Sequence, residues 1–152
     1  MTNQQYKSGD TIKLVIDENT LNDYNNFYFS RYPKRRVIPI NRPLHPSTNT
    51  WFVMRRPQLN ALKQKWKEFI VFFIENEGLS GLKIQKCTME FTSFFKTKIR
   101  ADCDNTTPKF LIDGLVEAQF IEDDDYLHLQ SITLRCGYDK LNPRTENLIT
   151  IL

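Results

Sequence analysis

Two aspartates one residue apart, Asp102 and Asp104, have the spacing in this chain that most clearly suggests chemistry. In an extended segment, side chains two positions apart point to the same side, so both carboxylates would face one point. Four consecutive acidic residues, 122–125, follow after a helix-like stretch. Clustered carboxylates repel one another unless a cation neutralises them. The pattern therefore predicts a Mg²⁺ site, because Mg²⁺ takes one or two carboxylates together with waters and substrate phosphate oxygens.

The acidic run at 122–125 is expected to supply a third metal ligand, and any of its three aspartates could serve. A metal held in this way would polarise a phosphodiester and activate a water molecule. Lys109, early in the helix-like stretch, is expected to stabilise phosphoryl charge or to orient that water. Mn²⁺ is expected to substitute for Mg²⁺.

Other chemistries fit the sequence less well. Residues 102–113 place acids at positions 1, 3 and 12 of a calcium loop, but Thr107 replaces the glycine of position 6 and Pro108 follows it. The glycines form no phosphate-binding loop, and neither histidine is near a marked nucleophile. Three cysteines without a CxxC spacing suit reduced thiols better than a disulfide framework or a zinc site.

Charge is distributed unevenly along the chain. Residues 1–100 carry 17 lysines and arginines against 8 acidic residues, residues 101–152 carry 4 against 10, and the net charge is +3. A basic surface beside an acidic focus suits a metal-dependent enzyme that acts on a polyanion. Ordinary solvated surface charge stays open as the alternative.

The segment at about 19–56 interleaves aromatic and basic residues and is predicted to be a long loop, because its periodicity is weak and it is rich in asparagine and proline. Stacking aromatics and guanidinium groups are typical of a nucleic-acid contact loop. Aromatic residues packed into the core under a solvated basic loop are the open alternative. The DNA contacts predicted in this segment are Tyr24, Arg31, Lys34, Arg35, Arg36 and Arg42, and Arg100 is added where the basic part meets the acidic part.

The hydrophobic pattern predicts one α+β domain over residues 1–152, with two main helices and a small mixed or antiparallel sheet. The predicted strands cover 11–18, 83–99, 126–138 and 144–152, and the predicted helices cover 57–78 and 107–118. Thr107 is expected to cap the second helix, with Pro108 as its first residue. Asp102 and Asp104 would then lie at a strand end.

With these residues in place, the chain resembles the RusA-type Holliday junction resolvases, small endodeoxyribonucleases of bacteriophages and prophages. The resemblance lies in Asp-x-Asp-Asn, a lysine shortly after, Asp-x-Leu four residues past that lysine, and a paired Asp-Asp. Here these are Asp102, Asp104, Asn105, Lys109, Asp113, Leu115 and Asp123–Asp124. The step from Asp104 to Lys109 is one residue longer than the common pattern. The first strand and its asparagine-rich sequel also resemble the family, which adds Asn22 to the predicted DNA contacts.

The resemblance implies a homodimeric, Mg²⁺-dependent endodeoxyribonuclease that resolves four-way and other branched DNA by paired symmetric nicks. The implied metal-binding and catalytic residues are Asp102, Asp104 and Asp124, with Lys109 as the catalytic lysine; Asn105, Asp113 and Asp123 are supporting residues. Two alternatives stay open. One is a branched-DNA-binding module of the same fold that no longer cuts, and the other is a phage structural or interaction protein.

The sequence contains no apolar run of about 18 residues, so no transmembrane helix and no membrane partner are expected. The first ten residues lack the basic and apolar parts of a secretion signal. The expected location is the cytoplasm of a bacterium or of a phage-infected host cell.

Overall fold

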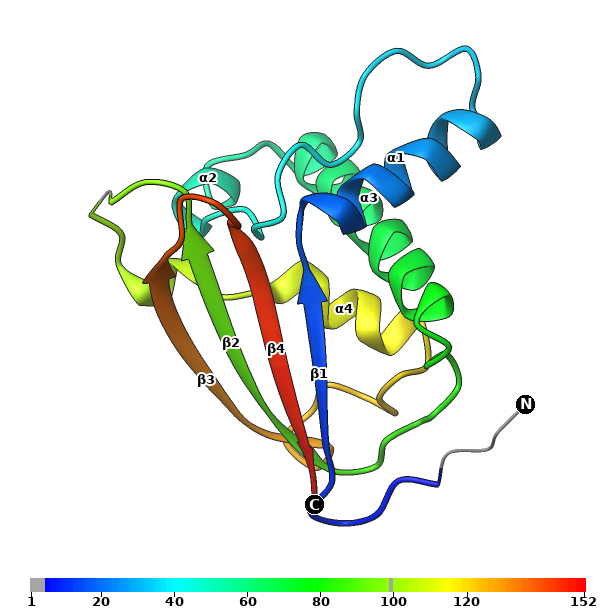
Figure 1. Ribbon diagram of the computed structural model, residues 1–152, viewed down its shortest axis with the longest axis vertical. Helices are drawn as coiled ribbons and strands as arrows, with labels where there is room; N and C mark the ends of the chain where they lie inside the picture. Colours follow the sequence, from blue (N-terminus) through cyan, green and yellow to red (C-terminus); the bar gives the residue numbers. More distant parts are fainter. Residues whose placement is uncertain (1–4, 99) are drawn as a thin grey trace.

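Four strands form one mixed sheet in the computed structural model of the chain, which describes residues 5–98 and 100–152 (Figure 1). The strands are β1 (Thr11–Ile16), β2 (Cys87–Phe95), β3 (Leu129–Tyr138) and β4 (Arg144–Ile151). The sheet order is β1-β4-β2-β3; β4 is antiparallel to both of its neighbours, whereas β2 and β3 are parallel. The predicted single α+β domain with a small mixed sheet is confirmed. Residue 99, at the end of one predicted strand, lies outside the described residues.

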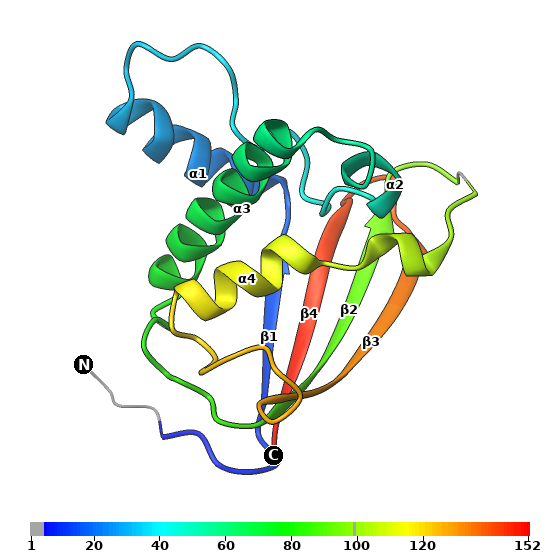
Figure 2. The same ribbon diagram turned by 180° about the vertical axis from the view of Figure 1, so that it is seen from behind.

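Two helices cover one face of this sheet (Figure 2). They are α3 (Arg56–Asn76), with Pro57 in its first turn, and α4 (Lys109–Glu117). Alternate strand residues point toward them and are buried, and the register aligns these residues across the sheet: Ile12 pairs with Ile149, which in turn pairs with Met89. The period of two in the strands therefore builds the core against the apolar stripes of α3 and α4.

Gly114 lets α3 and α4 approach closely. A Cβ atom placed at this position would lie 2.5 Å from Cβ of Ile70, nearer than real Cβ atoms come to their neighbours. Ile70 and the flanking Leu115 are fully buried at this contact. The position of α4, and with it the position of Lys109 at its first turn, depends on this close packing.

The predicted loop at 19–56 is wrong at both of its ends. It begins with a helix, α1 (Glu18–Arg31), and residues Thr48–Trp51 form the short helix α2, so the described residues contain three main helices instead of two. A capping box starts α1, in which Asp17 and Thr20 bond each other's backbone N–H groups. The asparagines, which favour helices weakly, concealed the apolar stripe that α1 packs against α3.

The segment between α1 and α2 is tied to the sheet. Thr145 of β4, itself buried, donates its hydroxyl to the carbonyl oxygen of Pro43 at 2.7 Å. Figure 1 shows this segment, α2 and the connection after β2 at the same end of the sheet. That end carries most of the residues with predicted functions. None of the described helices is both long enough and apolar enough to cross a membrane.

Candidate active site

The two aspartates of the Asp-x-Asp pair do not lie on a strand end. β2 ends at Phe95, and a 3-10 helix, η1 (Cys103–Thr106), contains Asp104, while Asp102 precedes it as the N-cap residue. The extended strand end that the prediction assumed is therefore wrong, because the backbone turns into a 3-10 helix between the two aspartates. The two carboxylates line different pockets instead of one.

Asp102 and Asp104 open into two different pockets. Asp102 lines a pocket of about 390 Å³ together with Arg42 and Arg100. Asp104 lines a second pocket of about 450 Å³ together with Lys63 and Lys109. Each carboxylate therefore lines its pocket together with basic side chains.

Asn105, the predicted supporting residue, lines both pockets and fixes the turn between them. Its side-chain carbonyl accepts a 2.8 Å hydrogen bond from the hydroxyl of Thr48. Thr48 is the first residue of α2, so this bond joins α2 to η1 across 57 positions of sequence. The position of the acidic turn thus depends on a helix that the sequence did not predict.

Lys109 joins the helix to the acidic run. Its ammonium group donates a 2.7 Å hydrogen bond to Oδ1 of Asp113 one turn later and lies 3.5 Å from Oδ2 of Asp124. The bond to Asp113, supported by the charge of Asp124, raises the pKa of Lys109. The ammonium therefore stays charged and holds two carboxylates that the chain separates by eleven positions.

Thr107 does not cap α4, contrary to the prediction. Its hydroxyl donates to the carbonyl oxygen of Asp104 at 2.9 Å, and Pro108 occupies the N-cap position without a side-chain cap. The backbone N–H group of Phe110, in the first turn of α4, instead donates to Nε2 of His45 at 3.0 Å. A side chain 65 positions away in sequence thus takes the place of a local cap.

His45 is a structural residue that sequence reasoning missed. Its Nδ1 lies 2.8 Å from the carbonyl oxygen of Pro46, and its ring packs against Trp66 and Phe110. With Nδ1 as the donor, Nε2 is free to accept from the backbone of α4. Burial lowers the pKa of His45 to about 4, so the ring is neutral near pH 7. Nothing local to its proline-rich segment indicates this role.

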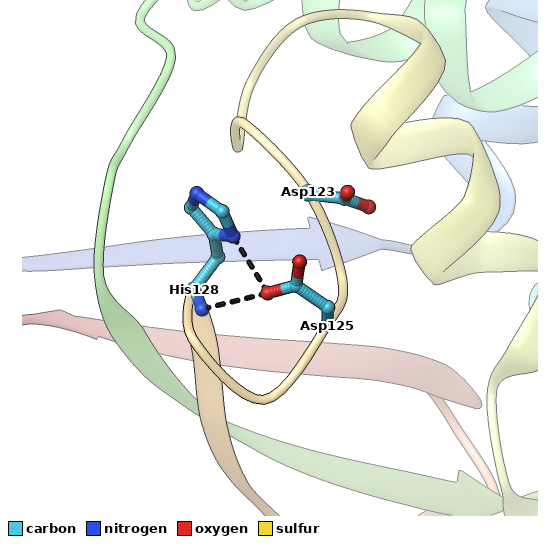
Figure 3. A group of neighbouring side chains, drawn as sticks. All are labelled: Asp123, Asp125 and His128. Atoms are coloured by element: carbon cyan, nitrogen blue, oxygen red, sulfur yellow. Dashed lines mark hydrogen bonds and ion pairs between the residues drawn. The ribbon is translucent and has the colours of Figure 1, made fainter.

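Asp125 points toward His128 (Figure 3), and one ligand atom each of Asp123, Asp125 and His128 lies within 4.8 Å of the others. Oδ1 of Asp125 bonds Nδ1 of His128 at 2.7 Å and also accepts from two backbone N–H groups of the turn, and the bond from His128 lowers the pKa of Asp125. Oδ1 of Asp123 accepts the backbone N–H of Asp124. The three aspartates of the acidic run therefore have different partners: Asp125 is paired with His128, and only Asp124 is paired with Lys109.

The three aspartates expected to bind metal are not gathered at one point. Among the residues that the structure describes, the one group of at least three His, Cys, Asp or Glu ligand atoms that all lie within 4.8 Å of one another is Asp123, Asp125 and His128. Two of the three predicted metal ligands are near Lys109. Asp104 lines the same pocket as Lys109, and Asp124 forms an ion pair with it. Two carboxylate donors suit Mg²⁺ chemically, whereas a three-aspartate set does not fit this arrangement.

The residues expected to contact DNA are exposed except for one. Tyr24 is 2% exposed and packs its ring 5.0 Å from that of Phe69, so it belongs to the core and cannot stack on a base. Arg35 is held over the rings of Tyr28 and Tyr32 and donates to the hydroxyl of Tyr28 at 2.7 Å. The other predicted contacts that are exposed are Asn22, Arg31, Lys34, Arg36, Arg42 and Arg100.

Phe52 is an exposed aromatic residue that sequence reasoning left unassigned. It is 73% exposed, stacks on Trp51 with ring centroids 4.5 Å apart, and lines the pocket of Asp104 and Lys109. The signal available in sequence was the aromatic pair itself, which precedes Arg55 and Arg56. The pocket thus combines acidic, basic and flat apolar groups.

No protein-family model matches this chain, and no curated protein matches it either.

Proposed function

We propose that this protein is a Mg²⁺-dependent endodeoxyribonuclease that cuts four-way and other branched DNA as a homodimer. The observation that carries the proposal is the position of Lys109, which is paired with Asp124 and lines one pocket with Asp104. These are three of the four residues to which the resemblance to RusA-type resolvases gives catalytic roles. They come from η1, α4 and the acidic run, so their proximity does not follow from sequence spacing.

Asp104 and Asp124 would hold the metal, which when bound polarises a phosphodiester and lowers the pKa of a bound water. Lys109 is charged and half exposed, so its ammonium can contact a non-bridging phosphate oxygen. Asp113 holds this ammonium by a hydrogen bond one turn along α4 and acts as a positioning residue.

The DNA would lie across the end of the sheet where the basic residues gather. Arg42 and Arg100 line the pocket beside Asp102, and further basic side chains follow α1. Guanidinium groups in such positions bind phosphate without reading the base sequence. Phe52 offers a flat apolar surface on which an unpaired base of a branch point can stack.

The test uses purified protein, a synthetic four-way junction and Mg²⁺ or Mn²⁺, with a linear duplex of the same sequence as the substrate control. We expect paired nicks near the branch point of the junction. Asp104→Asn and Asp124→Asn should each lower the cleavage rate by at least about a hundredfold, because the first removes a carboxylate from the pocket of Lys109 and the second removes the carboxylate that is ion-paired with Lys109. Asp23→Asn, which changes an exposed aspartate of α1, is the matched control and should cut normally.

Cleavage by Asp104→Asn at the rate of the unchanged protein would contradict the proposal. So would a failure of the unchanged protein to cut any branched substrate with either metal. The variants should be compared at equal folded concentration, with circular dichroism as the check, so that a loss of folding is not taken for a loss of catalysis.

A second candidate is a branched-DNA-binding protein that does not cut. It is favoured by the different directions of Asp102 and Asp104 and by the longer step before Lys109. It predicts junction binding that weakens steeply with salt, because each phosphate contact releases counterions, and no nicks with any divalent metal. Binding and cleavage measured on one labelled junction distinguish the two candidates.

A further inference from the structure

Two cysteines that are far apart in sequence meet beside η1. Sγ of Cys136, on β3, donates a hydrogen bond to Sγ of Cys103 at 3.2 Å. Cys103 is the first residue of η1 and lies between Asp102 and Asp104. The contact joins positions 33 residues apart, and it connects the edge strand of the sheet to the acidic turn.

The pair is accessible to small reagents. Cys136 is exposed and Cys103 is half-buried, whereas the third cysteine, Cys87, is buried. The register of β2 and β3 separates Cys87 from the pair, because Cys87 lies opposite Leu129 at one end while Cys136 lies opposite Ser93 toward the other. Cys103 and Cys136 therefore form a pair, and the distant Cys87 can serve as an internal control.

We propose that Cys103 and Cys136 form a modification site at which a hydroperoxide oxidises the two thiols to an intramolecular disulfide. The sulfur of one of the two cysteines attacks the peroxide, the O–O bond breaks, and a sulfenic acid and one water (or alcohol) are formed. The sulfur of the other cysteine then attacks the sulfenic acid sulfur, the S–O bond breaks, and the hydroxide takes up the proton of the attacking thiol as water. Two thiols are oxidised and one peroxide is reduced.

The contact serves the second step, because the sulfur that has not reacted with the peroxide already lies 3.2 Å from the sulfenic acid sulfur. Closing the bond from 3.2 Å to about 2.0 Å requires only a small movement of η1 against β3.

A metal site does not explain the pair. Within the described residues, no third His, Cys, Asp or Glu ligand atom lies within 4.8 Å of both sulfurs. Structural zinc sites need four ligands, so two thiols alone are too few. The inference is also independent of the proposed nuclease function, since it depends only on the two sulfurs and on an oxidant.

The test treats the purified protein with hydrogen peroxide, removes the peroxide and counts free thiols under denaturing conditions. We expect the count to fall from three to one and a non-reducing peptide map to show a Cys103–Cys136 link. Dithiothreitol should restore three thiols. The oxidised protein should also melt at a higher temperature than the reduced protein, because the link closes a loop in the unfolded chain.

Variants locate the chemistry. Cys87→Ser should still form the disulfide, whereas Cys103→Ser and Cys136→Ser should form none. The peptide map of the unchanged protein needs no variant, so the proposal stays testable even if a variant folds poorly. A map without the Cys103–Cys136 link, a link that involves Cys87, or a disulfide between two chains would overturn it.

Discussion

Lys109 donates to Asp113 at 2.7 Å and lies 3.5 Å from Asp124, so one ammonium group holds together two parts of the acidic pattern. This answers the electrostatic question that the clustered carboxylates raise, because a protein cation neutralises part of their charge. Asp125 is compensated separately, by His128 and by backbone N–H groups. The carboxylates of Asp102 and Asp104 have basic residues in their pockets instead.

At the residue scale, His45 gives a prediction about pH. Burial lowers its pKa to about 4 in the folded protein, while the unfolded chain has the ordinary value of about 6.5. Between these values the unfolded state binds more protons, so the free energy of unfolding falls as the pH drops. From about pH 7 to about pH 5.5, we expect His45 to account for a loss of about 1 kcal/mol.

The measurement for His45 is urea unfolding at both pH values. His45→Gln keeps an acceptor near the position of Nε2 but cannot titrate, so it should lose this part of the pH dependence. His128→Gln is the matched control and should keep it. An equal pH dependence in the unchanged protein and in His45→Gln would contradict the buried, neutral state of this ring.

At the scale of elements, the contact between α3 and α4 sets the position of Lys109. We expect Gly114→Ala to lower the free energy of unfolding by about 1–3 kcal/mol, because the new methyl group would overlap Ile70. Gly137→Ala is the control, since its methyl group meets the edge of the Phe94 ring, a side chain that can move. Chemical denaturation of both variants checks this, and a larger loss in Gly137→Ala would refute it.

The predicted loop at 19–56 contains a helix, α1, that was not predicted from the sequence. The stripe of Leu21, Tyr24 and Tyr28 has helical spacing and is buried in the structure. Polar asparagines between these residues hide the stripe, and the capping box of Asp17 and Thr20 is the local signal that indicates it. Tyr24 and Tyr28 thus follow the alternative that packs aromatic residues into the core, whereas Phe27, Phe52 and the basic residues of the segment stay exposed.

At the scale of the whole molecule, one candidate site per chain and two cuts per four-way junction lead us to expect a two-fold symmetric dimer. Light scattering on a sizing column should give about twice the 18.0 kDa mass of one chain, at least when junction DNA is bound. Dilution that separates the chains should abolish paired nicks before it abolishes single nicks. A monomer that makes paired nicks at every concentration would refute the dimer.

Local patterns in the amino-acid sequence were enough to predict the α+β class, the four strands and the helices α3 and α4. Their signals are local, because a period of two or of 3.6 residues reports which side of an element is buried wherever that element packs. Leu111, Leu115 and Ala118, which recur at spacings of four and three, are buried in the structure for this reason. The pairing of Lys109 with Asp113 also follows from helical spacing alone.

The tertiary structure alone decided the directions of Asp102 and Asp104, the cap that His45 provides and the approach of Asp124 to Lys109. Each of these depends on contacts between segments that are distant in sequence, such as the bond from Thr48 to Asn105. Spacing specifies where side chains point only when the backbone conformation is known. After β2 the backbone turns into a 3-10 helix instead of remaining extended, and that turn separates the two carboxylates that the sequence places side by side.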